Sequence, residues 1–106
     1  MRTVLLNLPH GGEEDPRRIA ALTRHLNARL LDFGPGGPEV LSFDTQCGLV
    51  RVDFPGRCTG DVLQRLSRQF GVQGVEAGGE ALFYLRENTR FEDLDYVWGC
   101  LFDLLT

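Results

Sequence analysis

The segment from Gly79 to Thr106 constrains the fold most, because it joins a short apolar strand to an amphipathic helix. Ala81–Leu85 is a continuous apolar and aromatic run of the length that buried strands have. Thr89–Glu92 matches a capping box, in which a Thr hydroxyl and a Glu carboxylate satisfy backbone N–H groups at a helix start. Apolar residues then recur at helical spacing, which predicts a wide buried face packed on a sheet. Its members are Phe91, Leu94, Trp98, Leu101 and Leu105, with Val97 and Leu104 beside them.

The N-terminal third predicts a strand followed by a helix. Thr3–Leu8 is short and apolar, as a strand requires. Asp15 and Pro16 suit the cap and the first position of a helix, and Gly34 would end it. A stripe of apolar residues at helical spacing gives this helix its buried face, namely Ile19, Leu22, Leu26, Leu30 and Phe33.

The middle of the chain predicts a β-hairpin and a second helix. The alternating segments Glu39–Phe43 and Leu49–Phe54 are separated by a short loop that contains glycine, which suits a hairpin. Thr59 is the expected N-cap of the helix, and Gly71 is its expected end. The apolar face of this helix consists of Val62, Leu63, Leu66 and Phe70.

The order of the elements predicts the fold class. Val72–Ala77 is a weaker strand that Gly74 interrupts, and Gly78–Gly79 is a tight turn into the last strand. The predicted order is βαββαββα in one domain of residues 1–106, because 106 residues is the size of a single domain. Helices on one face of a mostly antiparallel sheet would make an α+β two-layer sandwich.

The charge balance and the apolar pattern exclude several classes of partner. Eleven basic residues against fifteen acidic ones give a net charge of −4, which argues against broad contact with nucleic acid or anionic lipid. No apolar run approaches the roughly 18 residues that span a bilayer, and the N-terminus lacks the apolar core of a signal peptide. Three cysteines without close pairing fit reduced thiols. We therefore expect a cytoplasmic protein that binds neither nucleic acid nor membrane.

No group of residues has the pattern of a metal, phosphate or nucleotide site. One histidine and three acids precede the first helix and could bind a metal ion, but we expect an exposed loop whose acids favour the helix N-terminus. These residues are His10, Glu13, Glu14 and Asp15. His25 lies off the apolar stripe, so we expect it to be exposed. The glycine-rich Gly34–Pro38 follows a helix and lacks P-loop residues, which indicates a linker. The glycines of residues 71–79 do not open a helix, as a dinucleotide fingerprint would.

Three further groups leave alternatives open. Cys47 and Cys58 lie in predicted turns, where Arg57 would favour a Cys58 thiolate, but we expect inert residues. Cys100 falls between core positions and is expected to be packed. Cations are disfavoured in the first turn of a helix. The pair there, Arg17 and Arg18, is therefore a weak sign of an anion or partner contact, against simple solvation. The third group consists of the aromatic residues Phe91, Trp98 and Phe102. These side chains could form an interface hot spot, although packing in the core is favoured.

The last helix and its approach resemble a motif of a known enzyme family. Asn88-Thr89 followed by Glu92–Asp95 and the apolar helix is similar to the C-terminal helix of class V aminotransferases and cysteine desulfurases, which are pyridoxal-phosphate enzymes. Upstream, Glu39–Asp44 and Val62–Val72 resemble a strand and a helix of their C-terminal small domain. The resemblance implies the fold of that small domain in a chain that lacks the large, cofactor-binding domain.

The same resemblance implies that the family's chemistry is missing. All eleven basic residues are arginines, so no lysine can form the Schiff base. The arginine that binds the substrate carboxylate would fall at Ala81, whereas Arg86 lies closer to the Asn. The segment between Val72 and Ala81 has no cysteine for a desulfurase loop. We therefore expect no catalytic residue, no cofactor-binding residue and no metal ligand, and no enzymatic activity of the chain on its own.

Three functions remain open after these observations. The first is a stand-alone, non-catalytic domain that binds itself as a homodimer or binds another protein. The second is the small-domain subunit of a split pyridoxal-phosphate transferase, whose other subunit holds the cofactor. The third is a ferredoxin-like regulatory module that binds a small ligand at a sheet edge or a dimer interface.

Overall fold

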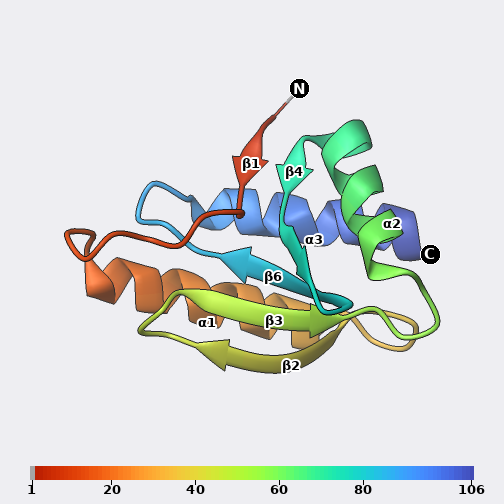
Figure 1. Ribbon diagram of the computed structural model, residues 1–106, viewed down its shortest axis with the longest axis horizontal. Coiled ribbons are helices and arrows are strands. Elements are labelled where there is room, and N and C mark those ends of the chain that lie inside the picture. Colours follow the sequence, from red (N-terminus) through yellow and green to blue (C-terminus); the bar gives the residue numbers. More distant parts are fainter. Residues whose placement is uncertain (1) are drawn as a thin grey trace.

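A computed structural model describes residues 2–106 of the chain, and Figure 1 shows its arrangement. Its helical elements are α1 (Pro16–Leu31), α2 (Thr59–Arg65), a wider π-helical turn η1 (Leu66–Phe70) and α3 (Phe91–Leu105). Its strands are β1 (Val4–Leu5), β2 (Glu39–Asp44), β3 (Leu49–Asp53), β4 (Val72–Gln73), β5 (Val75–Ala77) and β6 (Glu80–Tyr84). The predicted succession of elements is confirmed, with the weak strand split into β4 and β5.

The sheet is mostly antiparallel, as predicted. Four strands pair in the order β2-β3-β6-β5, while β1 and β4 form a separate parallel pair in which Val4 lies opposite Val72. Leu6 connects the two sheets, because its N–H donates to Gln73 O at 2.8 Å and its carbonyl accepts from Tyr84 N at 2.9 Å. The expected strand Thr3–Leu8 is thus shorter, since only Val4–Leu5 has a strand partner on β4.

Three glycines shape the strand region as predicted. Gly74 separates β4 from β5, and a Cβ placed on it would lie 2.7 Å from the Phe83 ring. A side chain does not fit there. The strand bends at this glycine, so that β4 belongs to one sheet and β5 to the other. Gly78 and Gly79 have φ of +61° and +81°, the left-handed region that a tight hairpin turn uses.

Helices α1 and α3 lie side by side behind the sheet in Figure 1. The core between these layers includes Val50, Val52, Phe54 and Phe83 from the strands and Leu22, Leu26, Leu94 and Leu101 from the helices. The predicted stripe of α1 is buried except at Phe33, which lies beyond the end of the helix at Leu31 and is only half-buried. None of the helices over residues 2–106 is long and apolar enough to cross a membrane.

The predicted helix starts are right for α1 and wrong for α2 and α3. Asp15 caps α1, with its Oδ1 accepting from Arg17 N at 3.0 Å. The cap of α2 is Cys58, one residue before the expected Thr59, because Cys58 is the last extended residue. No side chain completes that cap.

The capping box of α3, in contrast, starts one residue later than expected. Arg90 is the N-cap, and its backbone N–H donates to Asp93 Oδ2 at 3.1 Å. Thr89 and Glu92 do not form the box, because the Thr89 hydroxyl faces backward and accepts from Arg86 N at 3.4 Å. Thr89 therefore closes the turn before the helix rather than capping the helix itself.

Candidate protein-interaction surface

Phe91, Trp98 and Phe102 of α3 are not core residues, which corrects the favoured interpretation of the sequence. Phe91 is 38% exposed, Phe102 is 44% exposed and Trp98 is half-buried. The apolar surface of α3 extends further round the helix than the sheet and α1 cover. Its buried positions are Leu94, Val97, Cys100, Leu101 and Leu105. The remaining aromatics form a surface that the fold itself leaves open.

Three rings form a cluster on this surface. Trp98 and Phe102 are stacked, with ring centroids 5.4 Å apart, and Phe33 packs at 5.6 Å from Trp98 and 5.9 Å from Phe102. The Arg29 guanidinium lies over the Trp98 ring, 4.6 Å from its centroid. Trp98 Nε1 is buried and has no hydrogen-bond partner among residues 2–106. Offset aromatic pairs contribute about 0.5–1.5 kcal/mol beyond area burial, so these rings hold one another in place.

An apolar groove of about 380 Å³ runs beside this cluster, along α3. We call it the aromatic groove. Its walls and floor are formed by Phe70, Tyr96, Trp98, Gly99, Cys100, Phe102 and Asp103. The Tyr96 hydroxyl donates to Phe70 O at 2.8 Å and fixes the η1 side of the groove. Its floor lacks a side chain at Gly99, and glycine inside a helix costs about 1 kcal/mol relative to alanine.

A second exposed apolar site lies on the edge strand β2, where Leu41 and Phe43 are 41% and 47% exposed. Edge strands with exposed apolar residues can pair with another chain. A register shift between Val40 and Ser42 interrupts the regular pairing there, and such bulges protect edges. The aromatic groove is concave and contains Trp and Tyr, the residues enriched at interfaces, so it is the better candidate.

A cluster of charged side chains lies at the contact between α1 and α3. His25 Nε2 lies 2.8 Å and Arg29 Nε 3.2 Å from Asp95 Oδ1. The His25 ring also packs edge-on against Phe91 at 5.2 Å. His25 is therefore half-buried and paired, and the expected exposed histidine is wrong.

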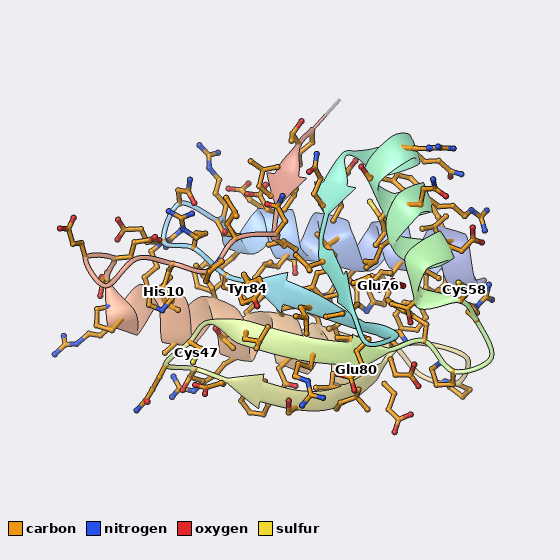
Figure 2. The ribbon with its side chains drawn as sticks, viewed as in Figure 1. His10, Cys47, Cys58, Glu76, Glu80 and Tyr84 are labelled. Atoms are coloured by element: carbon orange, nitrogen blue, oxygen red, sulfur yellow. The ribbon has the colours of Figure 1, made fainter. Side chains whose placement is uncertain are left out.

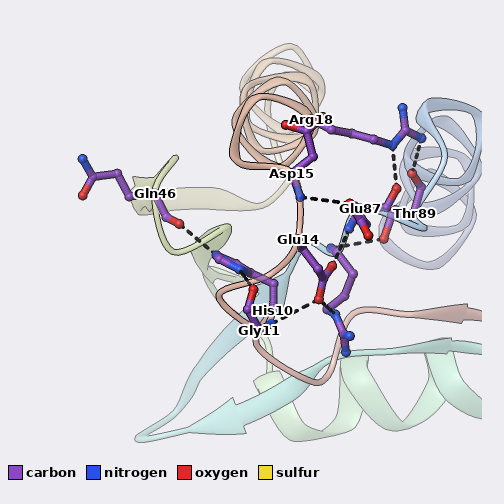
Figure 3. A network of polar contacts seen from close by, with 9 residues as sticks. His10, Gly11, Glu14, Asp15, Arg18, Gln46, Glu87 and Thr89 are labelled. Carbon is purple, nitrogen blue, oxygen red and sulfur yellow. Dashed lines mark hydrogen bonds and ion pairs between the residues drawn. The ribbon is translucent and has the colours of Figure 1, made fainter.

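The residues before α1 form a polar network with the loop before α3 (Figure 3). The central group is the Glu14 carboxylate, which accepts from Arg86 Nε at 2.7 Å, Glu87 N at 2.8 Å and Gly11 N at 3.1 Å. These hydrogen bonds, led by the one from the Glu87 N–H, lower the pKa of Glu14. Glu14 is half-buried, so the expected fully exposed loop is wrong at this residue.

Arg18 fastens the other side of the same loop. Its guanidinium donates to Glu87 O and, at 2.7 Å, to Thr89 O, and it lies 5.6 Å from the Phe91 ring centroid. The weak sign of an anion contact at Arg17 and Arg18 is thus explained for Arg18 by the chain's own carbonyl groups. Simple solvation is wrong for this side chain.

His10 connects this network to the β2–β3 loop. Its Nδ1 lies 2.8 Å from Gly11 O and its Nε2 lies 2.9 Å from Gln46 O. Both carbonyls can only accept, so the doubly protonated ring satisfies both contacts, and they raise the pKa of His10. Over residues 2–106, no cluster of His, Cys, Asp and Glu has the arrangement of a metal site.

The three cysteines are free thiols, and the two exposed ones lie at opposite ends of the molecule in Figure 2. A hydrogen bond with the Asp44 carboxylate raises the pKa of Cys47, which disfavours the reactive thiolate. Arg57 was expected to favour a Cys58 thiolate, but its Nη2 donates to Leu105 O at 3.0 Å instead. Cys100 is buried on α3, as predicted.

The chain's residues do not fit pyridoxal phosphate. The position that the family resemblance assigns to the substrate-binding arginine is Ala81, which is fully buried in β6. Arg86 is held by Glu14 at 2.7 Å, and the chain has no lysine for a Schiff base. No step of pyridoxal chemistry can therefore be assigned to these side chains.

Comparisons with known proteins support the fold. No protein-family model and no curated protein sequence matches the chain. Among solved structures, a NifS-like protein matches with a TM-score of 0.71 and 14% sequence identity, over 85% of this chain. The chain spans only 28% of that protein's length. A likeness at this identity concerns the fold alone, and it agrees with the aminotransferase-like α+β fold that the sequence resemblance implies.

Proposed function

We propose that this chain is a non-catalytic domain with an aminotransferase-like fold that acts by binding a protein through the aromatic groove. The observation that carries the proposal is the exposure of Phe102 and Trp98 beside an apolar groove on a helix whose other side is fully packed. Large rigid aromatics in a partly enclosed apolar site are typical of interface hot spots. The free thiols agree with a reducing compartment such as the cytoplasm.

The non-catalytic part of the proposal rests on where the polar groups are used. Glu14, Arg18, Arg86 and His10 are paired with one another or with backbone groups. None of them faces the aromatic groove. The groove has one charged lining residue, Asp103, so it offers apolar contact rather than an acid and base pair.

A photocrosslinking experiment in cells tests the proposal. A photoreactive phenylalanine analogue at Phe102 should give a crosslinked product with a protein. The same analogue at Phe43 is the matched control, because the two side chains are 44% and 47% exposed. Equal crosslinking at both positions, or none at Phe102, would refute the assignment of the groove as the binding surface.

A second candidate function is the small-domain subunit of a split transferase. It is favoured by the 28% coverage of the NifS-like protein, which leaves most of that protein's length without a counterpart here. A cofactor-bearing partner should then co-purify with this chain and carry the pyridoxal absorbance. Borohydride reduction should fix the cofactor to the partner, because this chain has no lysine. Absence of both colour and partner would eliminate this candidate.

A further inference from the structure

We infer that His10 is a pH-sensitive latch between the segment before α1 and the β2–β3 loop. The protonated ring closes the latch, and the neutral ring opens it. The latch is a regulatory contact that goes beyond the proposed function, because neither His10 nor its two partners line the aromatic groove. It rests on the geometry of the ring contacts, on the way the two loops are otherwise held and on the charges around the ring.

Both ring nitrogens of His10 face carbonyl oxygens (Figure 3). Nδ1 lies 2.8 Å from Gly11 O, and Nε2 lies 2.9 Å from Gln46 O. A neutral imidazole has one N–H and one nitrogen lone pair, whereas the imidazolium has two N–H groups. In the neutral ring, one lone pair would therefore face the lone pairs of a carbonyl oxygen. Only the protonated ring can make both contacts, so the arrangement itself depends on the proton.

The contact with Gln46 is the one that the neutral ring loses. Gly11 follows His10 directly in the chain, so its carbonyl stays close to the ring in any case. Gln46 belongs to a different loop, 36 residues away, and holding two loops together costs conformational entropy. Gln46 is also exposed, so water can donate to its carbonyl once the ring has left. Release therefore leaves no buried group unpaired, and it is readily reversed.

The two loops are otherwise held by separate partners. Gly48 O in the β2–β3 loop accepts from Leu85 N at 2.7 Å, while the segment before α1 ends in the polar network of Figure 3. No hydrogen bond other than the one from His10 joins residues 9–14 to residues 45–48, all of which the structure describes. Opening the latch therefore frees the segment before α1 from the β2–β3 loop without unfolding the elements on either side.

The surroundings of the ring favour the proton. The hydrogen bond with Gly11 O, followed by the one with Gln46 O, raises the pKa of His10. The Glu14 carboxylate adds to this rise, while partial burial and the Arg86 guanidinium oppose it. The latch is therefore closed at pH below the raised pKa, and it opens as the pH rises through a value above about 6.5.

None of the other titratable groups on the neighbouring elements forms a hydrogen bond with the ring, within residues 2–106. Each of them is exposed or bonded elsewhere, as the Asp44 carboxylate is to the Cys47 thiol. The proton on His10 is therefore controlled by its two carbonyl partners and by the pair of Glu14 and Arg86. The other groups are Glu13 and Asp15 before α1, Arg17 and Arg18 in its first turn, Asp44 and Cys47 at the β2–β3 loop, and Glu87 after β6.

An NMR titration of the natural chain between about pH 5 and 9 tests the inference. We expect the His10 ring to titrate above the ordinary value of about 6.5. The chemical shift of the Gln46 carbonyl carbon should change with the same midpoint. Each unit by which the His10 pKa exceeds the ordinary value corresponds to about a tenfold preference of the imidazolium for the closed latch. His25, the second histidine of the chain, is the internal control, because the Gln46 carbon should not follow its titration.

His10→Ala separates a switch from a merely structural contact. In this variant the Gln46 carbon should no longer titrate. The backbone order parameters of residues 11–13 should fall below those of the natural chain at pH about 5.5, and the two proteins should agree at pH about 9, where the natural latch is already open. A Gln46 shift that stays constant in the natural chain, or a difference in mobility that is equal at both pH values, would overturn the inference. If His10→Ala does not fold, the titration of the natural chain decides, since it needs no variant.

Discussion

Replacing Arg18 with methionine should destabilise the protein by about 2–3 kcal/mol. The Arg18 guanidinium is the side-chain donor to the carbonyls of Glu87 and Thr89. Glu87 is exposed, so water can replace the lost donor there, but Thr89 is only 6% exposed. A buried carbonyl left without a partner costs about 1–3 kcal/mol. Loss of the contact with the Phe91 ring adds about 0.5–1 kcal/mol.

A small gain offsets part of this loss, because a cation in the first turn of a helix costs a few tenths of a kcal/mol. For a chain of 106 residues, 1 kcal/mol corresponds to roughly 4–5 °C in the unfolding midpoint. We therefore expect the midpoint to fall by about 10 °C.

Urea unfolding followed by Trp98 fluorescence and by circular dichroism measures the effect. The matched control is Arg17→Met, in the same helical turn, whose exposed side chain donates no hydrogen bond within residues 2–106. That variant should remain within about 0.5 kcal/mol of the natural protein. Equal effects of the two substitutions would refute the assignment of Arg18 as a clamp on the loop before α3.

Three further predictions use single side chains. In thermal unfolding, Gly48→Ala should lower the free energy of unfolding by about 2–4 kcal/mol, because φ is +68° and the new Cβ would lie 2.9 Å from a carbonyl oxygen. The control is Gly36→Ala, at φ +81° in open space, which should lower it by only about 1 kcal/mol. The raised pKa of His10 gives stability that is complete below pH about 6.5 and is lost as pH rises through the folded value, so urea unfolding of His10→Gln should depend less on pH over this range. Cys100 should react with a thiol reagent only on unfolding, and Cys47 should react slowly at neutral pH.

Local patterns in the sequence predicted the framework of the fold. The Asp15-Pro16 start of α1 and the Gly78–Gly79 turn depend on neighbouring residues alone, and both are confirmed, as is the Gly74 break that glycine within a strand pattern indicates. The predictions that Thr59 and Thr89 cap the two helices are wrong, because several adjacent residues could act as the N-cap. The selection between them depends on distant contacts that a local pattern does not contain.

The candidate site was harder to predict than the fold. Helical spacing put Trp98 on the buried face of the last helix, which is wrong, because the width of the surface that a sheet can cover is a property of the assembled layers. The position of Phe33 against Trp98 depends on how the chain leaves α1. One signal was available in the sequence, since Gly99 interrupts an otherwise strong helical pattern without ending it. The polar network of Glu14 and Arg86 had none, because 72 positions separate the two residues.

The parallel pairing of β1 with β4 also determines when the N-terminal strand can fold. Val4 must wait for Val72, and Leu6 for both Gln73 and Tyr84, so the first strand made has no partner until most of the chain is present. Contacts this distant in sequence are slow to form, because the chain loses entropy on closing the loop before the contact contributes any stability. The β2–β3 hairpin and α1 should therefore assemble first, and the N-terminal strand should join in a late step of folding. Substitutions at Val4 should accordingly accelerate unfolding while leaving the folding rate nearly unchanged, which stopped-flow kinetics would measure.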